Sequence, residues 1–331
     1  MDVFDNDKIE NKVGTVDVNG YKIIGWKTAN SGYIAAAARN GKGYVLKKYS
    51  EFKLPRHDGS VSYERAKQLT NHFYANADRR VRLNRILSEL AKKNDDIIAP
   101  VDWFVNDICF VEATDFVSQF TLGRDVPNLP AKQVEGIMLS IAKAVRDIHG
   151  KGIVHGDIQL SNILAAKDAE GNAVGKLIDF DGSYCVDDMP SELGGDERYM
   201  SPELFFAMLT EFAPEAMAMQ STKSDIFSLG IVFHKYLTGG EFPGFADLPE
   251  YLAEKQNEGR AVYCCEAMVS ENGKIILSDK IKEEYLANLI CAMLQPELED
   301  RPTADEVVNV LCEKKVIPLK DGSRVLPASA R

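Results

Sequence analysis

Four oxygen-bearing side chains lie close together in the sequence, within residues 153–182. Two short apolar runs in this stretch, at 163–164 and 176–178, flank a polar turn, a pattern typical of a β-hairpin. In a hairpin, the start of the first strand lies beside the end of the second strand. We therefore expect the polar residues just outside these two points to meet there. These residues are Asp157, Asn162, Asp179 and Asp181.

A cluster of this kind suits magnesium-assisted phosphoryl transfer. Mg²⁺ takes oxygen ligands and keeps bound phosphates in its coordination shell, and Asn162 and Asp179 can supply such oxygens. A carboxylate beside the metal, Asp157, can accept a hydroxyl proton and orient the attacking oxygen. Asp181 is a candidate for an additional carboxylate that touches metal or simply faces solvent. The alternative interpretation of the stretch is a solvated acidic hairpin.

The order and spacing of these residues resemble a known family. The matching residues are His155-Gly156-Asp157, Asn162 and Asp179-Phe180. Together they resemble the catalytic loop and metal-binding turn of the protein kinase superfamily, in a divergent eukaryotic-like Ser/Thr form. The resemblance implies ATP and Mg²⁺ as cofactors, with Mn²⁺ as an alternative metal. It also implies structural roles for His155 and Phe180, with His155 packed under the site and not acting as a base.

Composition limits the class of protein. The chain has 331 residues, 45% of them hydrophobic, which is enough for a sizeable core, and a net charge of -11 that argues against a nucleic-acid surface. The six cysteines have no metal-ligand spacing and suit a reducing compartment. The start lacks the pattern of a signal peptide, and no apolar run reaches the ~18 residues of a membrane span. We therefore expect a cytoplasmic protein with no membrane span and no nucleic-acid partner.

The residues before the hairpin predict a small sheet and two helices. We expect strands at 21–25, 33–39, 43–49, 97–105 and 108–113. Helices are expected at 63–74 and 79–92, the second with an apolar stripe at helical spacing. Asn40-Gly41 predicts a tight hairpin, because both residues tolerate positive φ. This pattern matches the five-stranded antiparallel N-lobe and helix C of the family.

The resemblance assigns the nucleotide contacts to this sheet. Residues 25–32 resemble the glycine-rich loop, although only two of its three glycines are present. Lys47 resembles the strand lysine that holds the α- and β-phosphates, and the backbone of 112–114 would bond adenine at the hinge. Val111 would be the gatekeeper. The implied ATP-binding residues are Gly25, Gly32, Ile34, Val45, Lys47, Val111, Glu112, Ala113, Thr114 and Leu164.

Several positions depart from the family. The helix C position that carries a glutamate falls on Leu83 or Asn84, so the partner of Lys47 is either Glu64, in the earlier helix, or no acidic residue. Gly156 replaces the arginine that receives an activation-loop phosphate, so we expect such phosphorylation to matter less.

Further departures fall in the site itself. Gln159 replaces the lysine that neutralises the γ-phosphate, and Asp181 replaces the glycine of the Asp-Phe-Gly motif. Asp196 replaces a threonine that bonds the catalytic aspartate and that lysine, which predicts a rearranged peptide-side pocket.

The His-Gly-Asp loop also resembles small-molecule kinases of the aminoglycoside phosphotransferase type. Later motifs favour protein kinases: Ser201-Pro202-Glu203 resembles the end of the activation segment. Asp225 resembles the helix F aspartate that braces the catalytic loop, and Arg301 the arginine that pairs with Glu203 in the core. A buried charge is costly unless it is paired, so two halves of a pair 98 residues apart are specific evidence.

We therefore predict an α+β, bilobal protein-kinase-like fold. The predicted parts are an N-terminal peripheral segment (1–20), an N-lobe (21–114), a mainly helical C-lobe (115–316) and a C-terminal tail (317–331). The predicted function is ATP- and Mg²⁺-dependent phosphoryl transfer to Ser/Thr of protein substrates, including autophosphorylation, with regulation inside the domain or by separate proteins. The alternatives are a small-molecule kinase and a nucleotide-binding pseudokinase scaffold. The missing helix glutamate, the reduced glycine loop and Gln159 favour the pseudokinase.

Overall fold

A computed structural model describes residues 16–23, 25–29, 32–56, 60–118, 120–270, 272–317, 319 and 325–326. The chain divides into two compact units, Met1–Gln119 and Phe120–Arg331. The division lies slightly after the boundary expected at residue 114.

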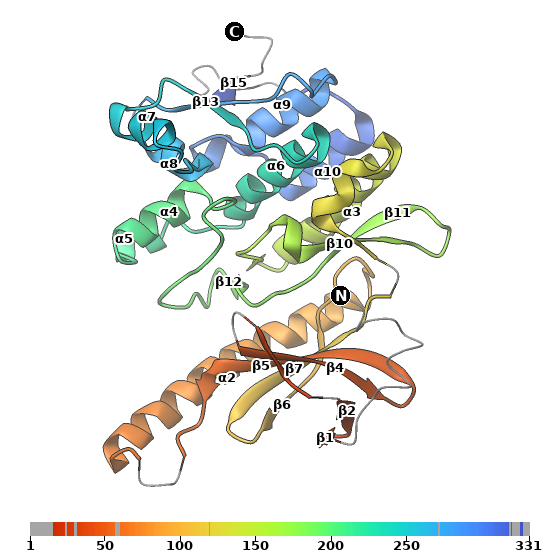
Figure 1. Cartoon of the computed structure of the whole chain (residues 1–331), viewed down its shortest axis with the longest axis vertical. Helices are drawn as coiled ribbons and strands as arrows, with labels where there is room; N and C mark the ends of the chain where they lie inside the picture. The colour runs from red at the N-terminus through yellow and green to blue at the C-terminus, as the bar shows by residue number, and fades with distance from the viewer. Residues whose placement is uncertain are drawn as a thin grey trace. The chain divides into compact units, whose positions relative to one another are not determined.

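The first unit is built on an antiparallel sheet (Figure 1). Its strands are β1 (Val16–Val18), β2 (Tyr21–Ile23), β3 (Lys27–Ala29), β4 (Gly32–Arg39), β5 (Lys42–Lys53), β6 (Pro100–Asn106) and β7 (Cys109–Asp115). Their order is β1-β2-β4-β5-β7-β6, with β3 pairing β4. The prediction of five strands needs correction, because β1 and β3 add to the sheet. β1 also lies in the segment expected to be peripheral, of which residues 1–15 are outside the described part.

The expected hairpin between β4 and β5 is confirmed. Arg39 pairs with Lys42, and the two residues between them, Asn40 and Gly41, have φ of 55° and 74°. Positive φ at both central positions matches the right-handed twist of the strands, which is why Asn-Gly suits this turn.

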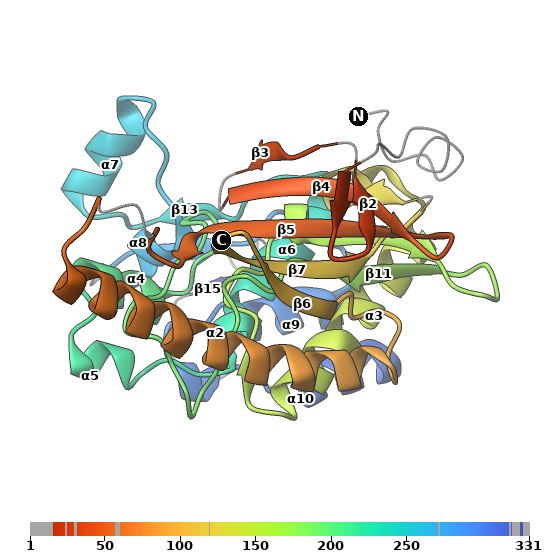
Figure 2. The same cartoon turned by 90° about the horizontal axis from the view of Figure 1, so that it is seen from below.

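A single long helix, α2 (Tyr63–Ala91), packs along this sheet (Figure 2). The prediction of two helices at 63–74 and 79–92 is therefore wrong. The residues between them, 75–78, contain neither glycine nor proline, so nothing in the backbone stops the helix there. Ser62 caps its start by accepting a hydrogen bond from the backbone of Arg65 at 3.3 Å.

The second unit is mainly helical. Its helices are η1 (Gly123–Asn128), α3 (Ala131–His149), η2 (Leu160–Asn162), α4 (Pro202–Leu209), α5 (Pro214–Met217), α6 (Lys223–Thr238), α7 (Glu250–Asn257), α8 (Cys264–Val269), α9 (Glu284–Met293), η3 (Leu298–Asp300) and α10 (Ala304–Glu313). The helix α6 is buried along most of its length, while α3 packs against α10 and against the hairpin that carries the candidate site (Figure 1). The mainly helical region expected after the sheet is thus confirmed.

Short strands complete this unit. They are β8 (Thr121–Leu122), β9 (Ile153–Val154), β10 (Ile163–Lys167), β11 (Ala173–Leu177), β12 (Tyr184–Cys185), β13 (Gly244–Ala246), β14 (Lys274–Ile276) and β15 (Val325–Leu326). β10 and β11 form the predicted hairpin, in which Ile163 pairs with Leu177. β15 pairs in parallel with β14 and Val325 is 1% exposed, so part of the expected tail at 317–331 packs into this unit.

Within the described part of the chain, no helix has the length and apolar character needed to cross a bilayer.

Candidate active site

The carboxylate of Asp157 is held by amide donors from its own loop. The Nε2 of Gln159 donates to both carboxylate oxygens, at 2.9 and 2.8 Å. The Nδ2 of Asn162 donates to the Oδ2 of Asp157 and to its backbone oxygen, both at 2.8 Å. Three side-chain hydrogen bonds therefore fix the direction of this carboxylate, and Gln159 takes the position beside it that the family gives to a lysine.

The hairpin places Asp179 beside this loop. The backbone nitrogen of Ile178, just past the end of β11, donates to the backbone oxygen of Asn162 at 3.0 Å. Asp179 follows directly, in the left-handed region with φ of 62°. A non-glycine residue there is uncommon and is typical of turns and functional sites. The predicted meeting of polar residues at this end of the hairpin is confirmed for Asp157 and Asn162, and Asp179 is adjacent to them in the chain fold.

The donor set fits magnesium. Because the Nδ2 of Asn162 is committed to Asp157, its amide oxygen is the end that can bind a metal, and Asp179 adds a carboxylate. Amide and carboxylate oxygens are the ligands that Mg²⁺ prefers. No group of three or more His, Cys, Asp or Glu residues that could hold a metal occurs among the residues described, so these two ligands would be completed by phosphate oxygens and water.

His155 has the structural role that the resemblance implies. It is fully buried, and its ring lies 4.8 Å from the ring of Phe180 between centroids. Its Nδ1 accepts from the backbone of Asp157 at 3.3 Å, which requires the proton on Nε2, where it reaches the backbone oxygen of Ile178 at 3.2 Å. His155 therefore joins the catalytic loop to the end of β11.

Asp225, in the first turn of α6, holds the backbone of the same loop through hydrogen bonds. Its Oδ2 accepts from the backbone nitrogen of His155 at 2.7 Å, and its Oδ1 from that of Gly156 at 3.0 Å. The ring of His149 contacts the Oδ2 at 2.9 Å. The predicted contact between Asp225 and the loop backbone is therefore present.

The predicted ion pair of Glu203 and Arg301 is also present. Arg301 donates from Nη1 and Nη2 to the two carboxylate oxygens of Glu203, at 2.9 and 2.8 Å, and both side chains are buried. Burial alone would raise the pKa of Glu203, but the guanidinium charge of Arg301 holds the pKa below its ordinary value. Removing one partner of such a pair costs about 3–5 kcal/mol.

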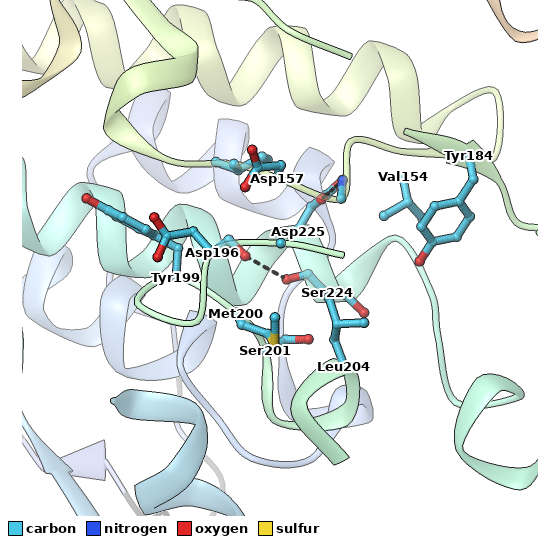
Figure 3. A pocket seen from close by; sticks show the side chains of 14 residues that line it. Val154, Asp157, Tyr184, Asp196, Tyr199, Met200, Ser201, Leu204, Ser224 and Asp225 are labelled. Carbon is cyan, nitrogen blue, oxygen red and sulfur yellow. Dashed lines mark hydrogen bonds between the residues drawn. The ribbon is translucent and has the colours of Figure 1, made fainter. Parts of the chain in front are cut away.

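A small cavity lies between the catalytic loop, the segment before α4 and the start of α6 (Figure 3). Its volume is about 20 Å³, room for one water molecule. Asp157 and Asp196 both line it, but Asp196 pairs with Arg198, whose Nε donates to its two oxygens at 2.8 and 3.0 Å. Asp196 thus contacts an arginine from its own segment, and the rearranged peptide-side pocket stays a prediction.

The sheet of the first unit presents two different faces around Lys47. Direct cross-strand partners share a face, so Lys47 lies on the same face as Ile34 of β4 and Glu112 of β7. By the same alternation, Val45 and Thr114 belong to this face, and all of these except Glu112 are half-buried. Ile34, Val45 and Lys47, three of the residues expected to bind ATP, therefore share one face of the sheet.

Two assignments on β7 need correction. Val111 and Ala113 lie on the opposite face, fully buried in a cluster with Tyr21 and Leu46, so Val111 does not face Lys47 as a gatekeeper would. Residues 112–114 are also interior to the sheet, paired with β5 on one edge and β6 on the other. Their backbone groups are therefore engaged in the ladder rather than available to adenine.

The structure also shows a buried carboxylate that sequence reasoning assigned to the wrong role. Glu112 is 3% exposed, and its side chain receives hydrogen bonds from Arg80 and Asn84 of α2 and from Tyr49 of β5. Glu64, one of the two alternatives expected for the partner of Lys47, lies in the first turn of α2, whereas Arg80 and Asn84 lie past the middle of this helix. An arginine four residues before Asn84 on the same helical face was the available sequence signal.

Other residues of the predicted site lie in the sheet of the first unit and in the hairpin of the second. Gly32 has φ of 151°, and a Cβ there would lie 2.1 Å from the backbone oxygen of Lys48, so this position requires glycine. The loop at 25–32 forms a pairing of β3 with β4, although its residues 30 and 31 lie outside the described part. Leu164 is a buried residue of β10, paired with Leu122 of β8, and Asp181 is half-buried in the turn after Phe180.

Comparison with known proteins agrees with this arrangement. A family model described as the protein kinase domain matches residues 67–311. The match begins inside α2, so Lys47 and the loop at 25–32 lie before it.

Curated proteins show similarity at lower coverage. Receptor like protein kinase S.3 of Arabidopsis thaliana is 24% identical over 208 residues, which cover 61% of this chain and 56% of that protein. Wee1-like protein kinase of Oryza sativa subsp. japonica is 26% identical over 206 residues, 62% of this chain and 33% of that protein. Serine/threonine-protein kinase Nek9 of Xenopus laevis is 26% identical over 239 residues, 70% of this chain and 22% of that protein. The chain thus corresponds to between about a fifth and just over half of the length of these relatives.

Proposed function

Because the chain belongs to the protein kinase family, we propose that it transfers the γ-phosphoryl group of ATP to serine or threonine hydroxyls of protein substrates, its own included. The observation that carries the proposal is the carboxylate of Asp157, held by Gln159 and Asn162 on a loop that Asp225 braces. A carboxylate fixed in direction at a braced loop is what positioning of an attacking hydroxyl needs.

Each residue then has a defined task. Asp157 accepts the proton of the substrate hydroxyl and orients its oxygen, and Asn162 keeps the carboxylate in place while its amide oxygen binds metal together with Asp179. Bound Mg²⁺ supplies positive charge to the phosphates. Lys47 adds a second positive charge for the α- and β-phosphates. We assign the backbone that bonds adenine to residues 117–118, after β7 ends, in place of 112–114, because the backbone nitrogen of Phe116 already donates to the backbone oxygen of Gly43 at 3.2 Å.

The test is transfer of labelled γ-phosphate from Mg-ATP by purified wild type and by Asp157→Asn. We expect label on the protein itself and on Ser/Thr peptides with wild type, and loss of label with the variant, because an amide cannot accept the proton. Phosphosite mapping then separates Ser/Thr from Tyr. Label found only on small metabolites would contradict the proposal and favour a small-molecule kinase.

One observation favours a second candidate, a nucleotide-binding pseudokinase. Gln159 is neutral and bonds both oxygens of Asp157, so this loop lacks the lysine charge for the transferring phosphate. A pseudokinase would bind ATP with micromolar or better affinity and transfer no label to any acceptor. Calorimetric ATP titration beside the transfer assay distinguishes the two.

We also propose a cytoplasmic location. All six cysteines are free thiols, and four of them are buried. Free buried thiols without disulfides are typical of proteins from reducing compartments. Fractionation of the native host cells, followed by detection of the chain, tests this proposal.

A further inference from the structure

The side chain of Glu112 is saturated by donors from two other elements. Its Oε1 accepts from the Nε of Arg80 at 2.5 Å and from the Nδ2 of Asn84 at 2.6 Å. Its Oε2 accepts from the Nη2 of Arg80 at 2.9 Å and from the hydroxyl of Tyr49 at 2.7 Å. A carboxylate has about four acceptor positions, so this group needs no further partner. Helix α2 and strands β5 and β7 are therefore tied at one point.

The charges of this cluster are buried. Arg80, Asn84 and Glu112 are 6%, 0% and 3% exposed, and Tyr49 is 2% exposed. A charge in such a place is strongly destabilising when it loses its partner, and the bidentate contact between guanidinium and carboxylate fixes geometry as well as energy. Separating α2 from the sheet would expose or orphan both charges. The cluster therefore opposes movement of the helix away from β5 and β7.

The cluster adjoins Lys47. Lys47 and Glu112 are direct cross-strand partners, so their Cβ atoms lie on one face about 5 Å apart. Tyr49 follows Lys47 on the same face of β5, and the Nζ of Lys47 lies 5.8 Å from the centre of its ring. The ring that supports Lys47 is thus the ring whose hydroxyl is bonded to Glu112.

We propose that the Arg80–Glu112 pair is a positioning device that holds α2 on the strand of Lys47 in the nucleotide-free protein. In this pair, the carboxylate of Glu112 belongs to the sheet and the guanidinium of Arg80 belongs to α2. Tyr49, Arg80 and Asn84 donate to Glu112 from β5 and α2, so these contacts form in protein without ATP. The nucleotide role of Lys47 rests on the function proposed above, whereas the clamp itself can be measured in protein that has no activity.

The first test is hydrogen exchange of residues 77–91 in protein without nucleotide. We expect slow exchange in wild type and faster exchange, confined to this part of α2, in Glu112→Gln and in the milder Tyr49→Phe. If Glu112→Gln fails to fold, Tyr49→Phe still provides the comparison. Fast exchange of 77–91 in nucleotide-free wild type, slowed only by added ATP analogue, would overturn the proposal.

The second test separates positioning from simple stabilisation. In Glu112→Gln, only a fraction of the molecules should hold α2 in the arrangement that binds ATP, and the apparent affinity for ATP falls by that fraction. This variant should therefore raise the KM for ATP by about tenfold, with a smaller change in kcat. Asn84→Asp combined with Glu112→Gln exchanges the amide and the carboxylate across their 2.6 Å contact. This double variant should return the KM to within about threefold of wild type, because Arg80 regains an anion four residues along its helix.

The matched control is Asp102→Asn. Asp102 pairs with Arg39 at 2.7 Å in the same sheet, but it is the cross-strand partner of Ala113 and so lies on the opposite face from Lys47. We expect its KM for ATP to equal that of wild type. A KM unchanged in Glu112→Gln, or raised equally by Asp102→Asn, would refute the positioning role. If wild type transfers no phosphate, the function proposed above fails, and ATP binding affinity replaces KM in the same comparison.

Discussion

At the scale of single residues, the candidate site depends on which groups donate hydrogen bonds to the carboxylate of Asp157. The amides of Gln159 and Asn162 donate to it from the same loop, so the orientation of the carboxylate depends on a few residues of local backbone. That backbone is in turn fixed by Asp225 and by the ring of His155. Because catalysis by positioning is sensitive to displacements of about 1 Å, small backbone changes in this loop should affect activity strongly.

Gly156 offers a direct test of this sensitivity. It has φ of +79°, and a Cβ there would lie 2.4 Å from the backbone oxygen of Gly182. We expect Gly156→Ala to separate the two segments and to lower kcat by about a hundredfold, beyond the strain of about 1–2 kcal/mol that the left-handed conformation itself imposes. Steady-state kinetics with thermal unfolding measures both effects.

Gly171→Ala is the matched control for Gly156→Ala. Gly171 has φ of +84°, but a Cβ there would meet nothing within 4 Å. Gly171→Ala should lose only the stability that the left-handed strain costs, about 1–2 kcal/mol, and keep its activity. Equal kcat values for the two variants would show that the close contact with Gly182 has no part in catalysis.

At the scale of elements, the sequence predicts which segments form strands better than it predicts their faces. The strand containing Val111 was expected and is present as β7, but its alternation places Val111 in the core and Thr114 on the face of Lys47. In a strand that is buried on both faces, apolar residues occupy successive positions, and the period of two disappears from the sequence. Only the pairing of β7 with β5 in the folded protein determines which side chains lie on the same face as Lys47.

This register predicts opposite effects for two substitutions on β7. Thr114→Met adds volume on the face of Lys47, where overpacking costs about 1–3 kcal/mol, so the Kd for ATP should rise by about tenfold or more. Val111→Ala removes volume from a fully buried core position, so it should lower the free energy of unfolding by about 2 kcal/mol and leave the Kd unchanged. Calorimetric titration and denaturant unfolding of both variants make the comparison. A reversed pattern would restore Val111 to the nucleotide face.

At the scale of the whole molecule, sequence reasoning succeeded where function depends on spacing along the chain. The catalytic loop, the turn at Asp179 and the pair of Glu203 with Arg301 are defined by residue types at set separations, and each could be predicted. The clamp at Glu112 could not, because its members come from three elements and a lone buried glutamate resembles a surface one in sequence. The single helix α2 was not predicted, because an apolar stripe marks only the part of a helix whose side chains are buried.

Protonation of a buried histidine should make the stability of the protein depend on pH. His234 of α6 is fully buried and neutral in its contacts, because its Nδ1 donates to the backbone oxygen of Glu241 at 2.9 Å and its Nε2 accepts from the backbone of Ser278 at 3.1 Å. Burial lowers the pKa of His234 from 6.5 to about 4. Below pH 6.5 the unfolded chain therefore binds a proton that the folded protein does not take up until about pH 4.

Stability from His234 is thus complete above pH 6.5 and is lost as the pH falls from 6.5 to about 4. The shift corresponds to about 3 kcal/mol of unfolding free energy over this window. Urea unfolding of wild type at several pH values should show this decline, and His234→Asn should reduce the slope although it lowers stability at every pH. His72→Gln, which changes an exposed histidine of α2, should leave the slope unaltered. The same slope in wild type and His234→Asn would exclude His234 as the source of the decline. Glu203 does not produce a decline that begins at pH 6.5, because its pKa lies below its ordinary value and its contribution is lost only at more acid pH.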